Sequence, residues 1–175
     1  GDVGSGKTIV AMISILAAIY NNKQAALMVP TEILANQHFE SFLSLLPKFL
    51  KIDLLTGKTS KRDKEKIYKK IENGDTDIII GTHALFQEKL NFKNLGFVAI
   101  DEQHKFGVHQ RLLLTSKNNN LLPDILLMTA TPIPRTLELT TYGSMSVSKI
   151  TEKPVGRQSI KTCLLYTSDA ADERN

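Results

Sequence analysis

Apolar residues fall into short unbroken runs that alternate with longer and more polar stretches of the chain. Runs of this kind are typical of strands in a parallel sheet, because helices cover both faces of such a sheet. Each run is followed by turn-forming or polar residues. The predicted strands are Ala25 to Val29, Ile52 to Leu55, Asp77 to Gly81, Gly96 to Glu102 and Ile125 to Met128.

The stretches between these runs predict helices. Lys7 to about Tyr20 is apolar nearly all round, which predicts a helix buried against the sheet. Thr31 can cap a second helix from Ile33 to about Phe49, with His38 and Phe42 on its apolar stripe. Strands that alternate with helices, without a visible repeat, predict a doubly wound α/β domain with a parallel sheet. A chain of 175 residues is long enough for one such domain.

The segment from Lys58 to Lys70 is the most highly charged part of the chain. It predicts a surface helix with a thin apolar seam at Ile67, Tyr68 and Ile71. Because acidic residues interrupt the basic ones, a solvated helix face explains the charges better than a nucleic-acid patch does. The formal net charge of the whole chain is +4, which permits a nucleic-acid partner without requiring one.

The composition is that of a soluble globular protein, with 42% hydrophobic and 23% charged residues. Cys163 is the only cysteine, so an internal disulfide is excluded. The longest apolar run, Ile9 to Tyr20, is too short to span a bilayer, and no signal peptide precedes it. We therefore predict a cytoplasmic protein that does not associate with membranes.

The first eight residues fit the phosphate-binding pattern G-x-x-x-x-G-K-[ST]. In this pattern the glycines let backbone N–H groups point at phosphate oxygens, and Lys7 would reach the β- and γ-phosphates. The Thr8 hydroxyl would bind Mg²⁺. A chance match is expected in roughly one chain of this length in a couple of hundred. The residues of the loop are Gly1, Asp2, Val3, Gly4, Ser5, Gly6, Lys7 and Thr8.

Two adjacent carboxylates, Asp101 and Glu102, follow a predicted buried strand. Ligands of parallel sheets bind at the carboxyl ends of the strands, where the loop Gly1 to Thr8 should also lie. Asp101 is therefore placed to hold Mg²⁺ together with Thr8. Glu102 is placed to orient or deprotonate the water that attacks the γ-phosphate. The alternative is an ordinary solvated loop after a strand.

A series of motifs along the chain resembles, in order, the motor motifs of superfamily 2 helicases. Longer motifs resemble the bacterial RecG family of branched-DNA translocases, over about Gly1 to Thr162. The short motifs are Gly1 to Thr8, Pro30-Thr31-Glu32, Thr56-Gly57, Gly81-Thr82-His83, Asp101-Glu102-Gln103-His104 and Thr129-Ala130-Thr131. The longer motifs are Asp101 to Val108 with Gln110-Arg111, Thr131 to Leu137, and Pro154 to Arg157.

The resemblance implies a RecA-like P-loop NTPase fold that uses ATP and Mg²⁺ and acts on DNA. It assigns ATP and Mg²⁺ to the loop, the metal to Asp101 and Thr8, and hydrolysis to Asp101 and Glu102. Residues that would couple the nucleotide state to DNA are Gln103, His104, Thr129 and Thr131. Residues that would touch the DNA backbone are Thr31, Thr56, Gly57 and Thr82. Thr31 could instead merely cap a helix and Thr56-Gly57 could be a turn, and His38 and His83 can be ordinary hydrogen-bonded histidines.

The resemblance also predicts how the chain divides. Residues 1–150 would form the ATP-binding RecA-like domain, and residues 151–163 would lead toward a second RecA-like domain. In the family that second domain supplies an arginine to the γ-phosphate, and an N-terminal wedge domain recognises the DNA junction. We expect both to be missing here. Residues 164–175 match nothing expected of the family and are interpreted as an artefact.

No strand precedes the phosphate-binding loop in this sequence, although such a loop normally follows one. We therefore interpret the sequence as a fragment that begins at the loop. The missing strand should leave the strand that ends at Asp101 without one of its neighbours. We expect the isolated piece to associate or to be partly unfolded.

Taken together, these features predict the motor domain of a RecG-like ATP-dependent DNA helicase that remodels forks and junctions in recombination and repair. An alternative is a translocase like Mfd, although Mfd usually has a second Glu where Gln103 stands, or another superfamily 2 motor that acts on RNA. A different class would be a nucleotide-gated binding module that does not translocate. Glu102 argues against that class, because a pure switch does not need it.

Overall fold

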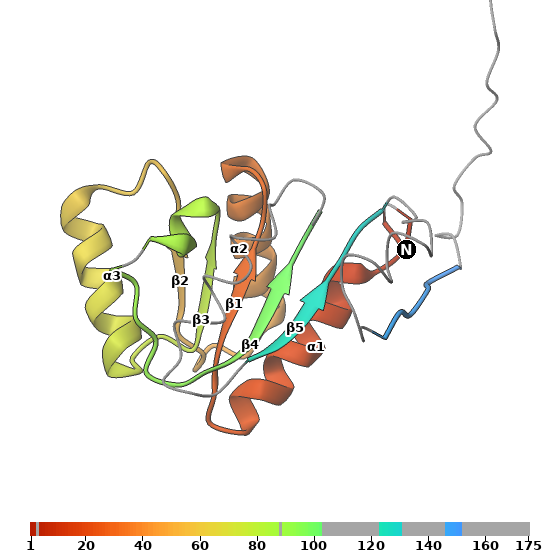
Figure 1. Cartoon of the computed structure of the whole chain (residues 1–175), viewed down its shortest axis with the longest axis horizontal. Helices are drawn as coiled ribbons and strands as arrows, with labels where there is room; N and C mark the ends of the chain where they lie inside the picture. Colours follow the sequence, from red (N-terminus) through yellow and green to blue (C-terminus); the bar gives the residue numbers. More distant parts are fainter. Residues whose placement is uncertain (3, 88, 103–122, 131–145, 152–175) are drawn as a thin grey trace, which may run out of the picture.

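The computed structural model describes residues 1–2, 4–87, 89–102, 123–130 and 146–151. These residues form an α/β domain in which helices and strands alternate for most of the chain (Figure 1). The helices are α1 (Lys7–Tyr20), α2 (Glu32–Leu45), α3 (Lys61–Asn73) and the short 3₁₀ helix η1 (His83–Phe86). The strands are β1 (Gln24–Met28), β2 (Ile52–Leu55), β3 (Ile78–Gly81), β4 (Leu95–Ile100) and β5 (Asp124–Leu127).

The five strands form one parallel sheet in the order β2-β3-β1-β4-β5 (Figure 1). Strand β1 lies at the centre, with Met28 paired with Gly81 of β3 on one side and with Ile100 of β4 on the other. All residues of β1 and β3 are buried, as expected for strands that are covered on both faces. The predicted doubly wound parallel sheet is confirmed.

Alternate residues of the central strands belong to two separate cores. On one face, Ala25 and Leu27 pack with α1 and α2. On the other face, Ala26 and Met28 pack with α3 and η1. This alternation follows from the two-residue period of a strand, and it explains why the apolar runs in the sequence are unbroken.

The helix ends are set by caps. Thr31 accepts a hydrogen bond from the Leu34 amide at 3.3 Å at the start of α2, as predicted. Helix α2 ends at Leu45, before the predicted end at Phe49. The reason is Pro47, which has no N–H and disfavours a helical conformation at the residue before it. Gly74 ends α3 in the left-handed conformation, with φ at 81°.

Two expectations, one about the burial of α1 and one about the neighbours of β4, were wrong. Helix α1 is not buried all round: Ile9, Val10 and Ile13 are 49%, 44% and 62% exposed, because only one side of the helix faces the sheet. Strand β4 does not lack a neighbour, because it lies between β1 and β5. Within the described residues the outer strand on that side is β5, which is only partly buried, with Ile125 36% exposed. The predicted loop at 118–120 lies outside the described residues.

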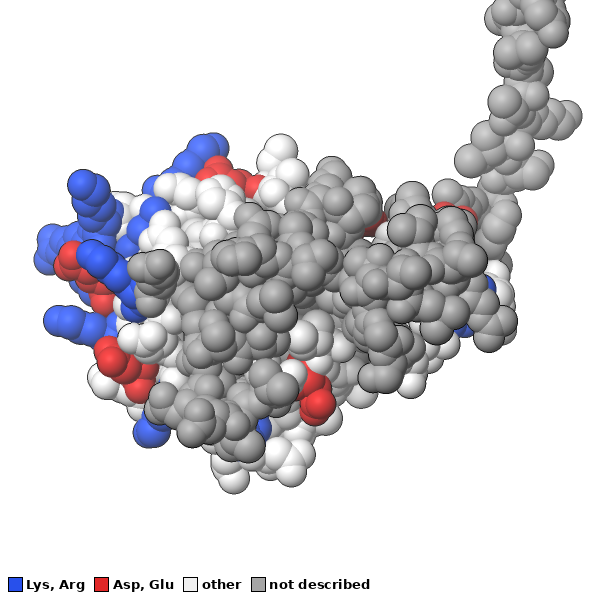
Figure 2. All heavy atoms as spheres, in the orientation of Figure 1, with Lys and Arg blue, Asp and Glu red and all other residues white. Residues whose placement is uncertain are grey.

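The charged helix α3 lies beside β2, the outer strand on one side of the sheet (Figure 1). Figure 2 shows its Lys and Arg side chains gathered at the left of the view, with Asp and Glu side chains among them. Several charges are paired: Lys66 with Asp63 at 3.3 Å, and Lys70 with Asp53 at 3.0 Å. These pairs favour the interpretation of a solvated helix face.

Candidate functional site

The carboxyl ends of the strands meet at one edge of the sheet, and backbone hydrogen bonds join them there. The Val29 amide donates to the Gly81 carbonyl at 3.0 Å. The Asp101 amide donates to the Met28 carbonyl at 2.8 Å, and the Met128 amide to the Ile100 carbonyl at 2.8 Å. The residues that follow β1, β3, β4 and β5 are therefore held in fixed positions at one edge.

The glycine-rich loop lies at this same edge. The amino group of Gly1 donates to the carbonyl of Thr129, just after β5, at 3.3 Å. Gly4 and Gly6 have φ angles of 76° and 91°, in the left-handed region that favours glycine. Helix α1 begins directly afterwards at Lys7, so its N-terminal amides and its positive dipole end belong to the loop. The predicted placement of the loop beside the strand ends is confirmed.

The loop carries the donors that a phosphate chain needs. The Lys7 ammonium donates to the Gly1 and Asp2 carbonyls at 2.7 Å each, so it lies folded over the loop. The Ser5 hydroxyl is buried without a hydrogen-bond partner in the part of the chain that the structure describes. Among the residues that the structure describes, nothing lies within 4 Å of where a Gly6 side chain would begin, so they leave this space open. These features fit a bound phosphate group.

Asp101 has a polar neighbour at each of its carboxylate oxygens. Its Oδ1 accepts from the Glu102 amide at 3.0 Å, and its Oδ2 lies 3.5 Å from the His38 Nε2. The side chains of His38 and Asp101 are only 11% and 15% exposed. Glu102 has φ at 50°, a left-handed conformation that costs about 1–3 kcal/mol for a residue other than glycine. The chain therefore turns sharply where β4 delivers its two carboxylates.

Asp101 and Thr8 carry oxygen donors of the kind that Mg²⁺ takes. Among the described residues, no group of three or more His, Cys, Asp or Glu side chains could hold a metal ion. Mg²⁺ is usually bound by one or two carboxylates together with substrate phosphates, and it keeps several waters. Asp101 after β4 and Thr8 in the first turn of α1 match that requirement.

The candidate DNA-contact residues differ in exposure. Thr31 and Gly57 are exposed, whereas Thr56 and Thr82 are 6% and 1% exposed. The Thr82 hydroxyl is buried and has no hydrogen-bond partner among the described residues. In this conformation the side chains of Thr56 and Thr82 do not reach the surface. Their predicted contacts with DNA would therefore need a rearrangement.

Glu32 belongs to the predicted motif Pro30-Thr31-Glu32 but was assigned no role there, and it connects this motif to the residue that follows Thr56-Gly57. Its Oε1 accepts from the Lys58 amide at 3.0 Å, and its Oε2 lies 3.3 Å from the Lys58 ammonium. Partial desolvation acts to raise the pKa of the Glu32 carboxyl, but the hydrogen bonds and charge of Lys58 outweigh it and lower that pKa. Glu32 therefore fixes the start of α2 against the turn at Gly57.

The family model of DEAD/DEAH box helicases matches residues 1–140. The chain belongs to the DEAD/DEAH box helicase family. Similar curated proteins include the ATP-dependent DNA helicase RecG of Aquifex aeolicus, 50% identical over 169 residues, and that of Bacillus subtilis, 51% identical over 163 residues. These matches cover 96% and 93% of this chain but only 21% and 24% of the relatives. The predicted resemblance to the RecG family is confirmed.

Solved structures agree with this assignment. A RecG bound to a three-way DNA junction has a TM-score of 0.78 and 44% sequence identity, covering 99% of this chain and 23% of that one. The DEAD-box protein Mss116p has a TM-score of 0.62 at 17% identity, covering 83% of this chain and 29% of that one, and supports the fold alone. The predicted RecA-like helicase fold is therefore confirmed.

For this helicase domain, the structure brings together part of the predicted site. The described part of the loop, Asp101, Glu102 and Thr129 lie at one edge of the sheet. His38, which the sequence left as an ordinary histidine, also reaches this edge. The only signal for it was a polar residue on the buried stripe of α2. Predicted site residues outside the described part are Val3, Gln103, His104 and Thr131.

Proposed function

We propose that this chain is the ATP-hydrolysing motor domain of a RecG-like DNA helicase that remodels branched duplex DNA, such as forks and junctions, in recombination and repair. The observation that supports it most is the contact of the loop with the end of β5, at the edge where β4 delivers Asp101 and Glu102. Nucleotide binding and hydrolysis need both groups at one place. The junction-bound RecG supports branched DNA as the partner.

The loop and Lys7 bind the phosphates of ATP in this proposal. The Lys7 ammonium exchanges its two carbonyl partners for phosphate oxygens, and the amides at the start of α1 point at the same oxygens. Thr8 and Asp101 hold Mg²⁺, which when bound neutralises phosphate charge. Glu102 orients the attacking water and takes its proton.

In this proposal, residues near the strand ends contact DNA or couple the nucleotide state to DNA. Thr31 and Gly57, which are exposed, touch the phosphate backbone, and Thr56 and Thr82 reach it only after a rearrangement exposes them. Such contacts position the DNA without reading its sequence. Residues that couple the nucleotide state to DNA are Gln103, His104, Thr129 and Thr131. Thr129 supports this role by its hydrogen bond to the loop at Gly1.

The division into segments also stays a proposal. Residues 1–150 form the first RecA-like domain, residues 151–163 lead toward a second one, and residues 164–175 are an artefact. The second domain and a wedge domain of the same polypeptide complete the enzyme, which works in the cytoplasm.

No helix in the described residues is long and apolar enough to cross a membrane. The chain spans about a fifth to a quarter of the length of the curated relatives it matches.

The test uses a chimeric helicase, in which the matching part of this chain replaces that segment of full-length RecG from Bacillus subtilis. ATP hydrolysis is measured without nucleic acid and with linear duplex, forked duplex or RNA of equal length. We expect forked duplex to stimulate hydrolysis most strongly.

Other outcomes of this experiment would favour the alternatives. Equal stimulation by linear and forked duplex would show that this motor does not couple to the junction-recognising wedge domain of RecG, and would favour a translocase like Mfd. Stimulation by RNA alone would favour an RNA motor. ATP binding with no hydrolysis under any condition would favour a nucleotide-gated binding module. Any of these three results would contradict the proposal.

A further inference from the structure

We propose that His38 is a positioning residue for the metal-binding carboxylate of Asp101, which it holds from helix α2 through its Nε2 atom. The inference rests on the proposed function, because it assigns His38 a task only if Asp101 binds Mg²⁺. The ring itself touches neither metal nor nucleotide in this proposal. It acts through the carboxylate.

The contact is placed where it can control one particular oxygen. The Asp101 backbone is fixed by its amide, which donates to the Met28 carbonyl at 2.8 Å. The Glu102 amide holds Oδ1 at 3.0 Å, and the His38 Nε2 lies 3.5 Å from Oδ2. Without His38, the carboxylate would be held at one oxygen and could rotate. Each carboxylate oxygen has two lone-pair sites, so both oxygens can still accept a further ligand.

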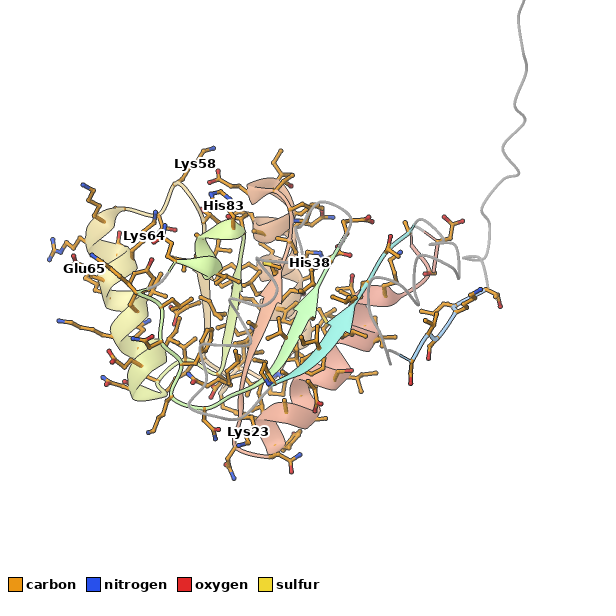
Figure 3. All side chains as sticks on the ribbon, viewed as in Figure 1. Lys23, His38, Lys58, Lys64, Glu65 and His83 are labelled. Carbon is orange, nitrogen blue, oxygen red and sulfur yellow. The ribbon has the colours of Figure 1, made fainter. Side chains whose placement is uncertain are left out.

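The position of His38 on α2 is unusual for its residue type. Ala35 and Phe42, one turn to either side of it, are both 0% exposed and belong to the apolar core beneath α2. His38 is 9% exposed on that same stripe. A polar side chain costs free energy in such a place unless it has a partner. Figure 3 shows His38 between α2 and the end of β4, where Asp101 supplies that partner.

Helix α2 is a firm support for such a contact. Its first turn is capped by Thr31 and joined to Lys58 through Glu32. Its body packs against β2 and β3. Residues that orient a metal ligand are themselves held firmly, and substituting them typically costs 10–100-fold in metal affinity or activity. A purely structural histidine would instead lower stability and leave metal affinity unchanged.

The test measures Mn²⁺ binding in the chimeric helicase with a non-hydrolysable ATP analogue, by following free Mn²⁺ with electron paramagnetic resonance. Thermal unfolding is measured in parallel. His38→Leu removes the N–H at similar volume, and we expect it to weaken Mn²⁺ binding about 10-fold or more. His38→Gln keeps a donor of similar reach and should recover most of the affinity. The matched control is Phe42→Leu, which should lower the melting temperature and leave Mn²⁺ affinity unchanged.

Two further variants keep the inference open to refutation. If His38→Leu does not fold, His38→Asn takes its place, because its amide is too short to reach Asp101 and should also weaken Mn²⁺ binding about 10-fold. Wild-type Mn²⁺ affinity in a folded His38→Leu or His38→Asn protein would overturn the role of His38 and would leave the assignment of Asp101 to the metal intact. Asp101→Asn tests the metal site itself: if it binds Mn²⁺ like the wild type, the assignment of Asp101 and the role of His38 both fail.

Discussion

Thr31 is the residue where a structural role and a functional role are hardest to separate. It caps α2 through its hydroxyl, and it is also exposed at the sheet edge where DNA contacts are proposed. Asp is as good a helix cap as Thr, yet its charge repels phosphate. The two roles therefore respond differently to one substitution.

We expect Thr31→Ala to lower the free energy of unfolding by about 1 kcal/mol, because α2 loses its cap. Thr31→Asp should keep that stability and weaken DNA binding by the chimeric helicase. Denaturant melts and DNA titrations at a fixed salt concentration measure the two effects. The matched control is Gln37→Glu, which adds the same charge at an exposed position further along α2. If Thr31→Asp binds DNA as the wild type does, Thr31 is only a cap.

At the scale of elements, helix α1 shows what the hydrophobic pattern can and cannot predict. Its bounds were predicted correctly, because the loop ends at Gly6 and turn-forming residues follow Tyr20. Its burial was predicted wrongly, because a continuous apolar run does not reveal how many sides of the helix pack against other elements. Exposed Ile9 and Ile13 are one turn apart and lie on the same side of the helix.

This exposed side of α1 should drive association of the isolated chain. We expect sedimentation velocity to show larger species as the concentration of the 175-residue chain rises. Ile13→Lys should reduce that association, whereas Gln37→Lys, which adds the same charge on α2, should not. The substitution at exposed Ile13 should change stability by less than about 0.5 kcal/mol. A chain that stays monomeric at every concentration would contradict this expectation.

Other elements show the same division between local and long-range information. The end of β2 follows from the turn at Thr56-Gly57, so the sequence predicts it well. Helix α3 instead runs from Lys61 to Asn73, later than the predicted Lys58 to Lys70, because Ser60 caps its start and Gly74 its end. The order of the strands depends on contacts between distant segments, and for this reason the neighbours of β4 were predicted wrongly. The His38–Asp101 contact joins residues 63 positions apart, and no local pattern reveals it.

At the scale of the whole molecule, the sheet edge collects groups from across the chain into one place. Gly1 and Thr129 are 128 positions apart in the sequence, yet they are hydrogen-bonded. The phosphate-binding loop and the residues that follow β4 and β5 are far apart in the sequence, and they lie at the same edge of the sheet because the strands are parallel. The proposed chemistry depends on this meeting more than on any single motif.

The most direct test of the account compares nucleotide binding with hydrolysis in the chimeric helicase carrying Glu102→Gln. We expect this protein to bind ATP with wild-type affinity and to hydrolyse it at least about 100-fold more slowly with forked DNA, because only the water-activating group is lost. Lys7→Ala should instead weaken ATP binding itself, because the loop loses the ammonium group that contacts the phosphates. Wild-type turnover in Glu102→Gln would contradict the account, because Glu102 would then have no catalytic role.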